Sequence, residues 1–132
     1  MNDFLWKGKV YFADTDAAGV VHHSQYLRYL EAARIDYFDY LGVAYENLQS
    51  QNIGFVPHKV KAQYHRPLRF ADKFTIKVKV IQLKKASLTL YQPLYKHDVL
   101  VYDAHITFAC MNEKDWSIIS IPQDLKKYLD TQ

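Results

Sequence analysis

Cysteine is almost absent from the sequence, and long apolar runs are missing. The single cysteine, Cys110, excludes an internal disulfide framework and a zinc site built from several cysteines. Residues 1–10 lack the apolar core of a secretory signal peptide, and no segment is apolar enough to span a bilayer. We therefore expect a soluble, cytoplasmic protein without a membrane span.

A large excess of one charge sign is also missing. The 17 Lys and Arg residues against 14 Asp and Glu give a formal net charge of +3, which is too small to indicate a nucleic-acid partner. Hydrophobic residues make up 49% of the 132 residues, which predicts one folded domain, residues 1–132, with a substantial core. Aromatic residues make up 15%, including 11 tyrosines, which is typical of a sheet-rich fold or an aromatic-lined pocket.

The longest helical pattern runs from Ser24 to Leu41. Apolar residues cover a wide face of this helix and charged residues are few, so we expect other elements to surround it. Ser24 is a suitable N-cap, and Gly42 is a natural residue to end the helix. Glu31 and Arg34 are three residues apart, which predicts a buried ion pair on one helix face. A shorter helix is expected at 43–50.

Alternation of apolar and polar residues predicts strands in the rest of the chain. The expected strands cover residues 4–13, 55–65, 74–83, 87–95, 99–111 and 116–121, and a last helix covers 123–129. Pro93 predicts that its strand lies at an edge or at a bulge. Consecutive strands joined by short turns pair antiparallel. The expected fold is therefore α+β of the hotdog type, a curled antiparallel sheet of five to six strands wrapped around one long helix.

The outer face of this sheet is expected to be partly covered. Lys77, Lys79 and Thr89 point to it, together with several tyrosines. Tyrosines exposed on a sheet face that no helix covers favour contact with another subunit.

Between the first strand and the long helix, residues 14–26 gather most of the reactive groups. A carboxylate such as Asp16 is ionised at neutral pH and can act as a nucleophile or as a base that activates water. The helix start near His23 supplies unpaired N–H groups that favour negative charge on a carbonyl oxygen. Gly19 permits close approach of a substrate. Spacing alone leaves open that Asp14 and Asp16 only close a turn.

His22 and His23 do not predict a metal site. Adjacent histidines point in different directions from most backbones, so we expect no shared metal ion and place His23 as a polar pocket residue. Ser24 does not lie in a G-x-S-x-G elbow, which favours helix capping over a nucleophilic role.

Residues 10–21, followed by His23, Tyr26 and Glu31-Ala32-Ala33-Arg34, resemble the 4-hydroxybenzoyl-CoA thioesterase family of hotdog acyl-CoA thioesterases. Residues 53–56 and 64–72 resemble the second block of that family, and the resemblance extends over residues 4–125. It implies hydrolysis of acyl-CoA or acyl-carrier-protein thioesters without a metal or cofactor. It also implies homodimers, often paired into homotetramers, with active sites at the subunit interface.

The resemblance also assigns roles to single residues. Asp16 matches the catalytic carboxylate, and the backbone N–H at His23 matches the group that holds the thioester oxygen. Lys84 and Lys85 match a basic turn that holds the CoA phosphates, although one relative has three basic residues there. With Gly19 and the backbone of Ser24, the two lysines form the expected substrate-binding set.

Other functions fit the sequence less well. A haloacid dehalogenase-type phosphatase would have Thr or Val at Ala18, and a calcium loop would have Glu at Gln25. A hydratase would place a histidine on the long helix, where this sequence has none. The main alternative is a hotdog protein that binds acyl-CoA or an acyl-carrier protein without hydrolysing it. Such a protein would not require a carboxylate at position 16.

Overall fold

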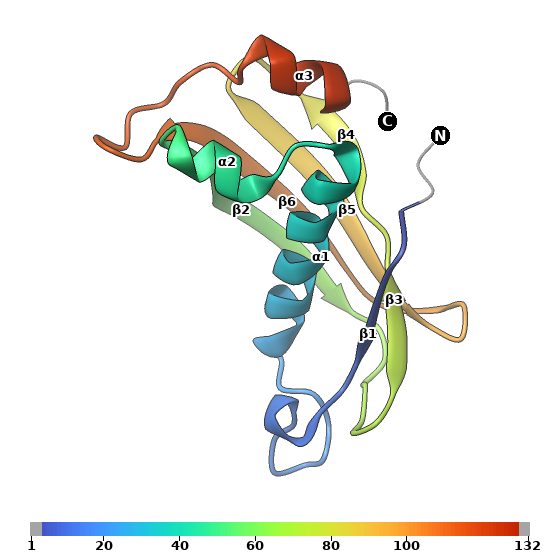
Figure 1. Ribbon diagram of the computed structural model, residues 1–132. Helices are drawn as coiled ribbons and strands as arrows, with labels where there is room; N and C mark the ends of the chain where they lie inside the picture. The colour runs from blue at the N-terminus through green and yellow to red at the C-terminus, as the bar shows by residue number, and fades with distance from the viewer. Residues whose placement is uncertain (1–3, 130–132) are drawn as a thin grey trace.

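An antiparallel sheet curls around a long helix in the computed structural model, which describes residues 4–129 (Figure 1). The elements are β1 (Trp6–Lys9), the 3₁₀ helix η1 (Phe12–Asp14), α1 (Gln25–Leu41), α2 (Tyr45–Ser50), β2 (Ile53–Tyr64), β3 (Lys73–Ile76), β4 (Lys79–Leu83), β5 (Ser87–Lys96), β6 (Val99–Asn112) and α3 (Gln123–Leu129). The strand order is β1-β3-β5-β6-β2, with β4 also paired to β5. The predicted hotdog fold is confirmed.

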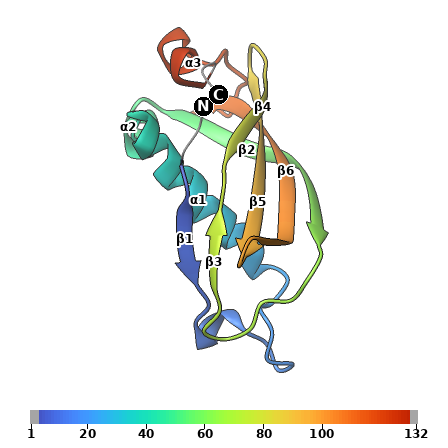
Figure 2. The ribbon, with the colours of Figure 1, turned by 90° about the vertical axis from the view of Figure 1, so that its right-hand side faces the viewer.

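Helix α1 lies against the concave face of the sheet (Figures 1 and 2). Leu30, Ala33 and Tyr37 are fully buried, at the three- and four-residue spacing that places side chains on one face of a helix. Gly42 ends the helix with φ +91°, and its N–H donates to the carbonyl oxygen of Asp39. The predicted end of the helix is therefore confirmed. Within residues 4–129 no helix is long and apolar enough to cross a membrane.

The predicted ion pair between Glu31 and Arg34 is wrong. Glu31 faces solvent, whereas the Arg34 guanidinium lies 4.9 Å from the ring centre of Phe108 in β6. Burial lowers the pKa of Arg34, and the nearby charge of Glu31 only partly opposes this effect. A spacing of three residues permits an ion pair on a helix, but here contact with the sheet determines the direction of the arginine.

Pro93 was predicted to lie at a sheet edge or at a bulge. The edge position is wrong. Its strand, β5, pairs with β6 on one side and with β3 and β4 on the other. The pairs Ile76–Leu94 and Lys79–Tyr91 place Pro93 opposite Lys77, in the gap between β3 and β4. Proline has no N–H to donate, so the partner strand is interrupted there. For this reason the single strand predicted at 74–83 is two strands.

Two other predicted strands are shorter or absent. β1 ends at Lys9 because the N–H of Val10 donates to the carbonyl of Asp72 and the chain then turns into η1. Residues 116–121 contribute only an isolated bridge from Ile118 to Met111, and Trp116 has φ +57°. The short helix at 123–129 is confirmed as α3.

One buried polar contact ties α1 to the centre of the sheet. The Gln92 side chain is 0% exposed, and its Nε2 donates to the carbonyl oxygen of Leu30 at 2.9 Å. A buried amide that found no partner would destabilise the fold, so this hydrogen bond fixes how the helix sits over β5.

Candidate active site

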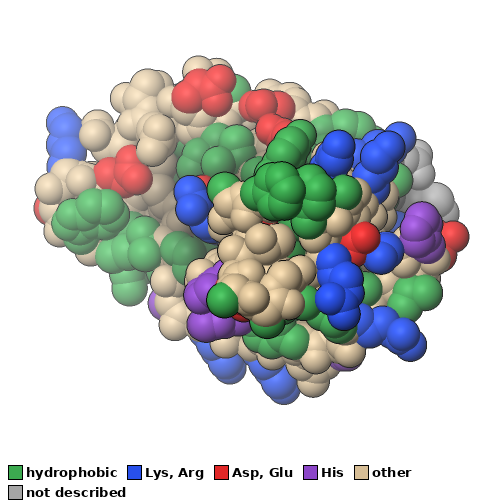
Figure 3. Space-filling model, turned by 90° about the horizontal axis from the view of Figure 1, so that it is seen from below, with side chains coloured by type: hydrophobic (Ala, Val, Ile, Leu, Met, Phe, Trp, Pro, Cys, Tyr) green, Lys and Arg blue, Asp and Glu red, His purple; other side chains and the backbone are tan. Residues whose placement is uncertain are grey.

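The loop before α1 is a small hairpin at the lower end of Figure 1. Thr15 pairs with Val21, and the Asp16 N–H donates to the Val20 carbonyl at 2.9 Å. Gly19 turns the chain with φ +81°, a left-handed conformation that favours glycine. Seen from below, this end carries protruding hydrophobic side chains with basic groups and histidines around them (Figure 3).

Asp14 and Asp16 have different surroundings. The Oδ2 atom of Asp14 accepts hydrogen bonds from the Tyr11 N–H at 3.0 Å and the Tyr29 hydroxyl at 2.8 Å, which fixes the loop against α1. Burial and the neighbouring Asp14 carboxylate raise the pKa of Tyr29. Asp16 is exposed, and its Oδ1 accepts from the Ala18 N–H at 2.9 Å. Asp16 therefore closes its own turn while its carboxylate faces solvent.

The start of α1 is organised by His22 and not by the side chain of Ser24. The His22 Nδ1 accepts from the Ser24 N–H at 3.2 Å and lies 2.8 Å from the Ser24 Oγ. Ser24 has φ −75° and ψ −19°, which are helical angles, and its side chain makes no capping hydrogen bond. A capping side chain normally extends from a residue with extended backbone. The predicted capping by the Ser24 side chain is therefore wrong.

The two backbone polar groups of His23 have different surroundings. Its carbonyl oxygen accepts a hydrogen bond from the Tyr64 hydroxyl at 2.8 Å. Nothing in residues 4–129 accepts a hydrogen bond from its N–H. The His23 ring stacks on the His22 ring, with 4.2 Å between centroids. An amide at the N-terminus of a 17-residue helix, with the helix dipole behind it, is suited to stabilise a developing oxyanion.

His23 borders an open hollow of about 270 Å³ between the start of α1 and the end of β2. The residues that line it are Val21, His23, Tyr26, Tyr64, His65, Arg66 and Pro67. Tyr26 stacks on Tyr102, and Tyr64 packs edge-on to the same ring, so one wall is aromatic. The role of Tyr64 was not predicted, because neither strand alternation nor the family block that begins at Tyr64 indicates a partner 41 residues away.

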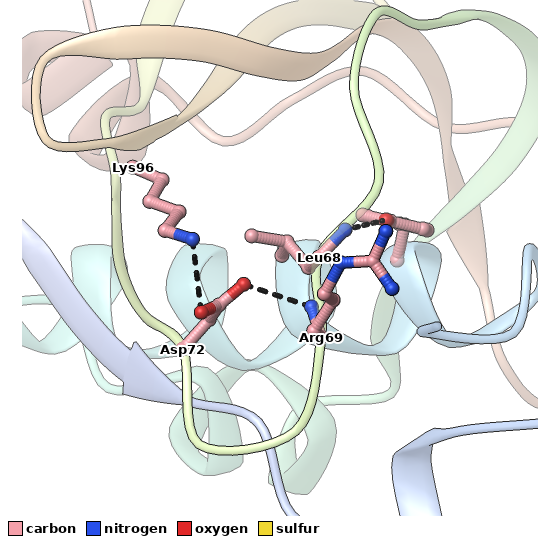
Figure 4. A network of polar contacts seen from close by, with 5 residues as sticks. Leu68, Arg69, Asp72 and Lys96 are labelled. Carbon is pink, nitrogen blue, oxygen red and sulfur yellow. Dashed lines mark hydrogen bonds and ion pairs between the residues drawn. The ribbon is translucent and has the colours of Figure 1, made fainter. Parts of the chain in front are cut away.

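The turn after β2 pairs with the hairpin, and Figure 4 shows polar contacts of this turn. The Val21 N–H donates to the Leu68 carbonyl at 2.8 Å, and Val20 pairs with Arg69. Asp72 closes this turn by accepting from the Arg69 N–H at 2.8 Å, and it also lies 2.9 Å from the Lys96 Nζ. Burial acts to raise the pKa of Asp72, but the Arg69 N–H and the Lys96 ammonium outweigh it, so the pKa is below its ordinary value.

Changing Asp72 to Asn is expected to lower the free energy of unfolding at pH 7 by about 1–2 kcal/mol, because the charge-assisted contact with Lys96 is lost. Since the carboxyl pKa is depressed in the folded state, its stabilisation is complete above the ordinary value of 3.8 and disappears as the pH falls through the folded pKa. Urea unfolding at several pH values measures this. A difference between wild type and D72N that does not shrink as the pH falls below 3.8 would contradict the assignment.

Lys84 and Lys85 lie far from this hairpin in the chain. Both are exposed in the turn between β4 and β5, near α3, at the opposite end of the molecule (Figures 1 and 2). Asp16 and His23 belong to one hairpin and helix start, but Asp16 is not among the residues that line the hollow. The fold therefore joins two of the predicted site regions and separates the third. In residues 4–129 no group of three His, Cys, Asp or Glu residues is placed to hold a metal ion.

Comparison with known proteins gives consistent matches over nearly the full chain. The model of the thioesterase-like superfamily matches residues 10–129. The acyl-CoA thioesterase YbgC of Helicobacter pylori is 30% identical over 131 residues, which cover 92% of this chain and 96% of the relative.

Solved structures agree with the family match. A protein of Aquifex aeolicus has a TM-score of 0.91 at 28% identity, with 96% of this chain and 98% of that chain covered. A gentisyl-coenzyme A thioesterase has a TM-score of 0.87 at 28% identity, with 93% and 99% covered. The chain therefore belongs to the thioesterase-like superfamily and is a thioester hydrolase.

Proposed function

We propose that this enzyme hydrolyses acyl-CoA thioesters to a free acid and CoA, with Asp16 as the reacting carboxylate. The observation that carries the proposal is the His23 N–H, which no described residue accepts, at the start of α1 beside an open hollow. A thioester oxygen placed at this N–H gains negative charge as its carbonyl carbon is attacked. The amide and the helix dipole stabilise that charge.

Asp16 would act in one of two ways. As a base, its carboxylate takes a proton from water while the water oxygen attacks the carbonyl carbon; the tetrahedral intermediate then expels CoA thiolate, which takes up that proton. As a nucleophile, a carboxylate oxygen attacks the carbon itself, CoA thiolate leaves, and water hydrolyses the resulting anhydride. The exposed carboxylate, with no cation within 4.0 Å in residues 4–129, is compatible with both roles.

We further propose that the working enzyme is a homodimer, or a dimer of dimers, with active sites between subunits. β2 is an edge strand of 12 residues that pairs only with β6 in the described chain. Its Val60 lies opposite the buried Ile106 and still is 45% exposed. A second copy placed along β2 would cover this apolar surface and enclose the open hollow at His23.

A thiol-release assay on a panel of aromatic, short-chain and long-chain acyl-CoA substrates, with acyl-carrier-protein substrates beside them, tests the activity. We expect release of free CoA from at least one acyl-CoA. Binding of acyl-CoA without release from any substrate would instead favour the non-hydrolysing binder.

Replacing His23 by alanine separates its backbone from its ring. Because the backbone N–H remains in His23→Ala, we expect kcat to stay within about fivefold of wild type, far from the 10²–10³-fold loss that follows removal of an oxyanion donor. Steady-state kinetics on the best acyl-CoA gives the answer. A loss of 100-fold or more would show that the imidazole, not the amide, supplies the catalytic group.

A further inference from the structure

The hollow at His23 shares two of its lining residues with a second hollow. Arg66 and Pro67 line the first hollow, and they also line a neighbouring hollow of about 340 Å³ beside the β5–β6 turn. Lys96 and His97 border the second hollow, and His65 borders the first. None of the residues that line either hollow is acidic. Because they share Arg66 and Pro67, we treat the two hollows as one groove, with His23 at one end and His97 at the other.

Arg66 is the cation of this groove that has no carboxylate partner. Within 4.0 Å in residues 4–129, the Lys96 ammonium pairs with Asp72, and the His65 Nε2 lies 3.6 Å from Asp103 Oδ1. Arg66 is exposed and belongs to neither pair. A guanidinium with its donors available binds phosphate in a bidentate manner.

The backbone at Arg66 is anchored to the neighbouring strand. The N–H groups of His65 and Arg66 both donate to the carbonyl of Val101, at 2.9 Å and 3.1 Å. Pro67 follows directly and restricts the backbone of the residue before it to extended angles. Arg66 therefore borders both hollows from an anchored backbone, so that binding an anion there does not require ordering of the main chain.

We propose that Arg66 binds the phosphate groups of the CoA moiety, and that the groove from His23 to His97 is the path of the CoA. This inference rests on the proposed function, because it takes acyl-CoA as the substrate. The proposal places the anion site at the same end of the folded molecule as His23. Lys84 and Lys85 lie at the other end and are not required for this site in the same chain.

The test compares substrates with and without phosphate groups. For Arg66→Gln we expect KM for acyl-CoA to rise about tenfold, as for loss of one charge-assisted contact, with kcat little changed. KM for the matching acyl-N-acetylcysteamine thioester, which has no phosphate, is expected to change less than about twofold. In Arg66→Lys, KM for acyl-CoA should return part of the way to the wild-type value, because lysine restores the positive charge but not the bidentate geometry of the guanidinium group.

Arg69→Gln is the matched control. Arg69 is also exposed, lies three residues further on, and lines neither hollow, so this variant should leave both KM values unchanged. An equal rise of both KM values in Arg66→Gln would overturn the proposal, and so would an unchanged KM for acyl-CoA.

Direct binding of CoA, measured by calorimetry, separates this inference from the proposed function. Weaker CoA binding in Arg66→Gln supports the groove even if no acyl-CoA is hydrolysed. Hydrolysis of acyl-CoA with CoA affinity equal in wild type and Arg66→Gln overturns the groove and leaves the proposed function intact.

Discussion

Asp16→Asn is expected to reduce kcat for acyl-CoA hydrolysis about 1000-fold, because an amide is neither a base nor a nucleophile at neutral pH. The fold should survive the change. The Asp16 Oδ1 accepts the Ala18 N–H at 2.9 Å, and an asparagine carbonyl oxygen can accept the same hydrogen bond. Steady-state thiol release, together with thermal unfolding of both proteins, measures the two effects separately.

Asp39→Asn is the control for the loss of one carboxylate. Asp39 is exposed on α1 near its C-terminal end, away from the hairpin, so its replacement should leave kcat unchanged. If Asp16→Asn kept the wild-type kcat, the carboxylate would serve only to close the turn through Ala18. The assignment of the reacting group would then be wrong, although the membership of the family would stand.

A single turnover in oxygen-18 water distinguishes the two roles of Asp16. In the nucleophilic route, water attacks the anhydride and can leave the label in the Asp16 carboxylate, which mass spectrometry of the peptide detects. In the general-base route, the label appears only in the product acid.

Leu30→Ala is expected to lower the free energy of unfolding by about 2–5 kcal/mol, the usual range for removing a fully buried leucine side chain. Leu30 is 0% exposed in α1, where the helix faces the sheet. Its carbonyl, which accepts from Gln92, remains in the variant, so the loss reports packing alone. Urea unfolding with the m-value checked gives the free-energy difference.

Leu27→Ala offers a matched comparison on the same helix. Leu27 is 39% exposed, one turn earlier, and its truncation should cost less than about 1 kcal/mol. Similar losses for the two variants would mean that α1 is not packed against the sheet as described. A Leu27→Ala loss that depends on protein concentration would indicate that this position is covered by a second subunit.

Much of the candidate site was predictable from the sequence. The turn before α1, its glycine, and the helix start near Ser24 depend on local backbone preferences, which act over a few residues. That the Ser24 side chain makes no capping hydrogen bond was not predictable, because the Ser24 Oγ instead lies 2.8 Å from the Nδ1 of the His22 ring. Tyr64 and Arg66 could not be recognised either, since their roles depend on which strand end lies beside α1.

The sequence by itself determined the long helix and its end at Gly42, the final helix, and the alternating strands that make an antiparallel sheet. Periodicity and turn formation depend on residues that are close together in the sequence. Only the tertiary structure decided that Pro93 lies in a central strand, that Arg34 turns to Phe108, and that Lys84 and Lys85 are remote from His23. Each of these depends on contacts between residues distant in the chain, for which the pattern of neighbours carries no signal.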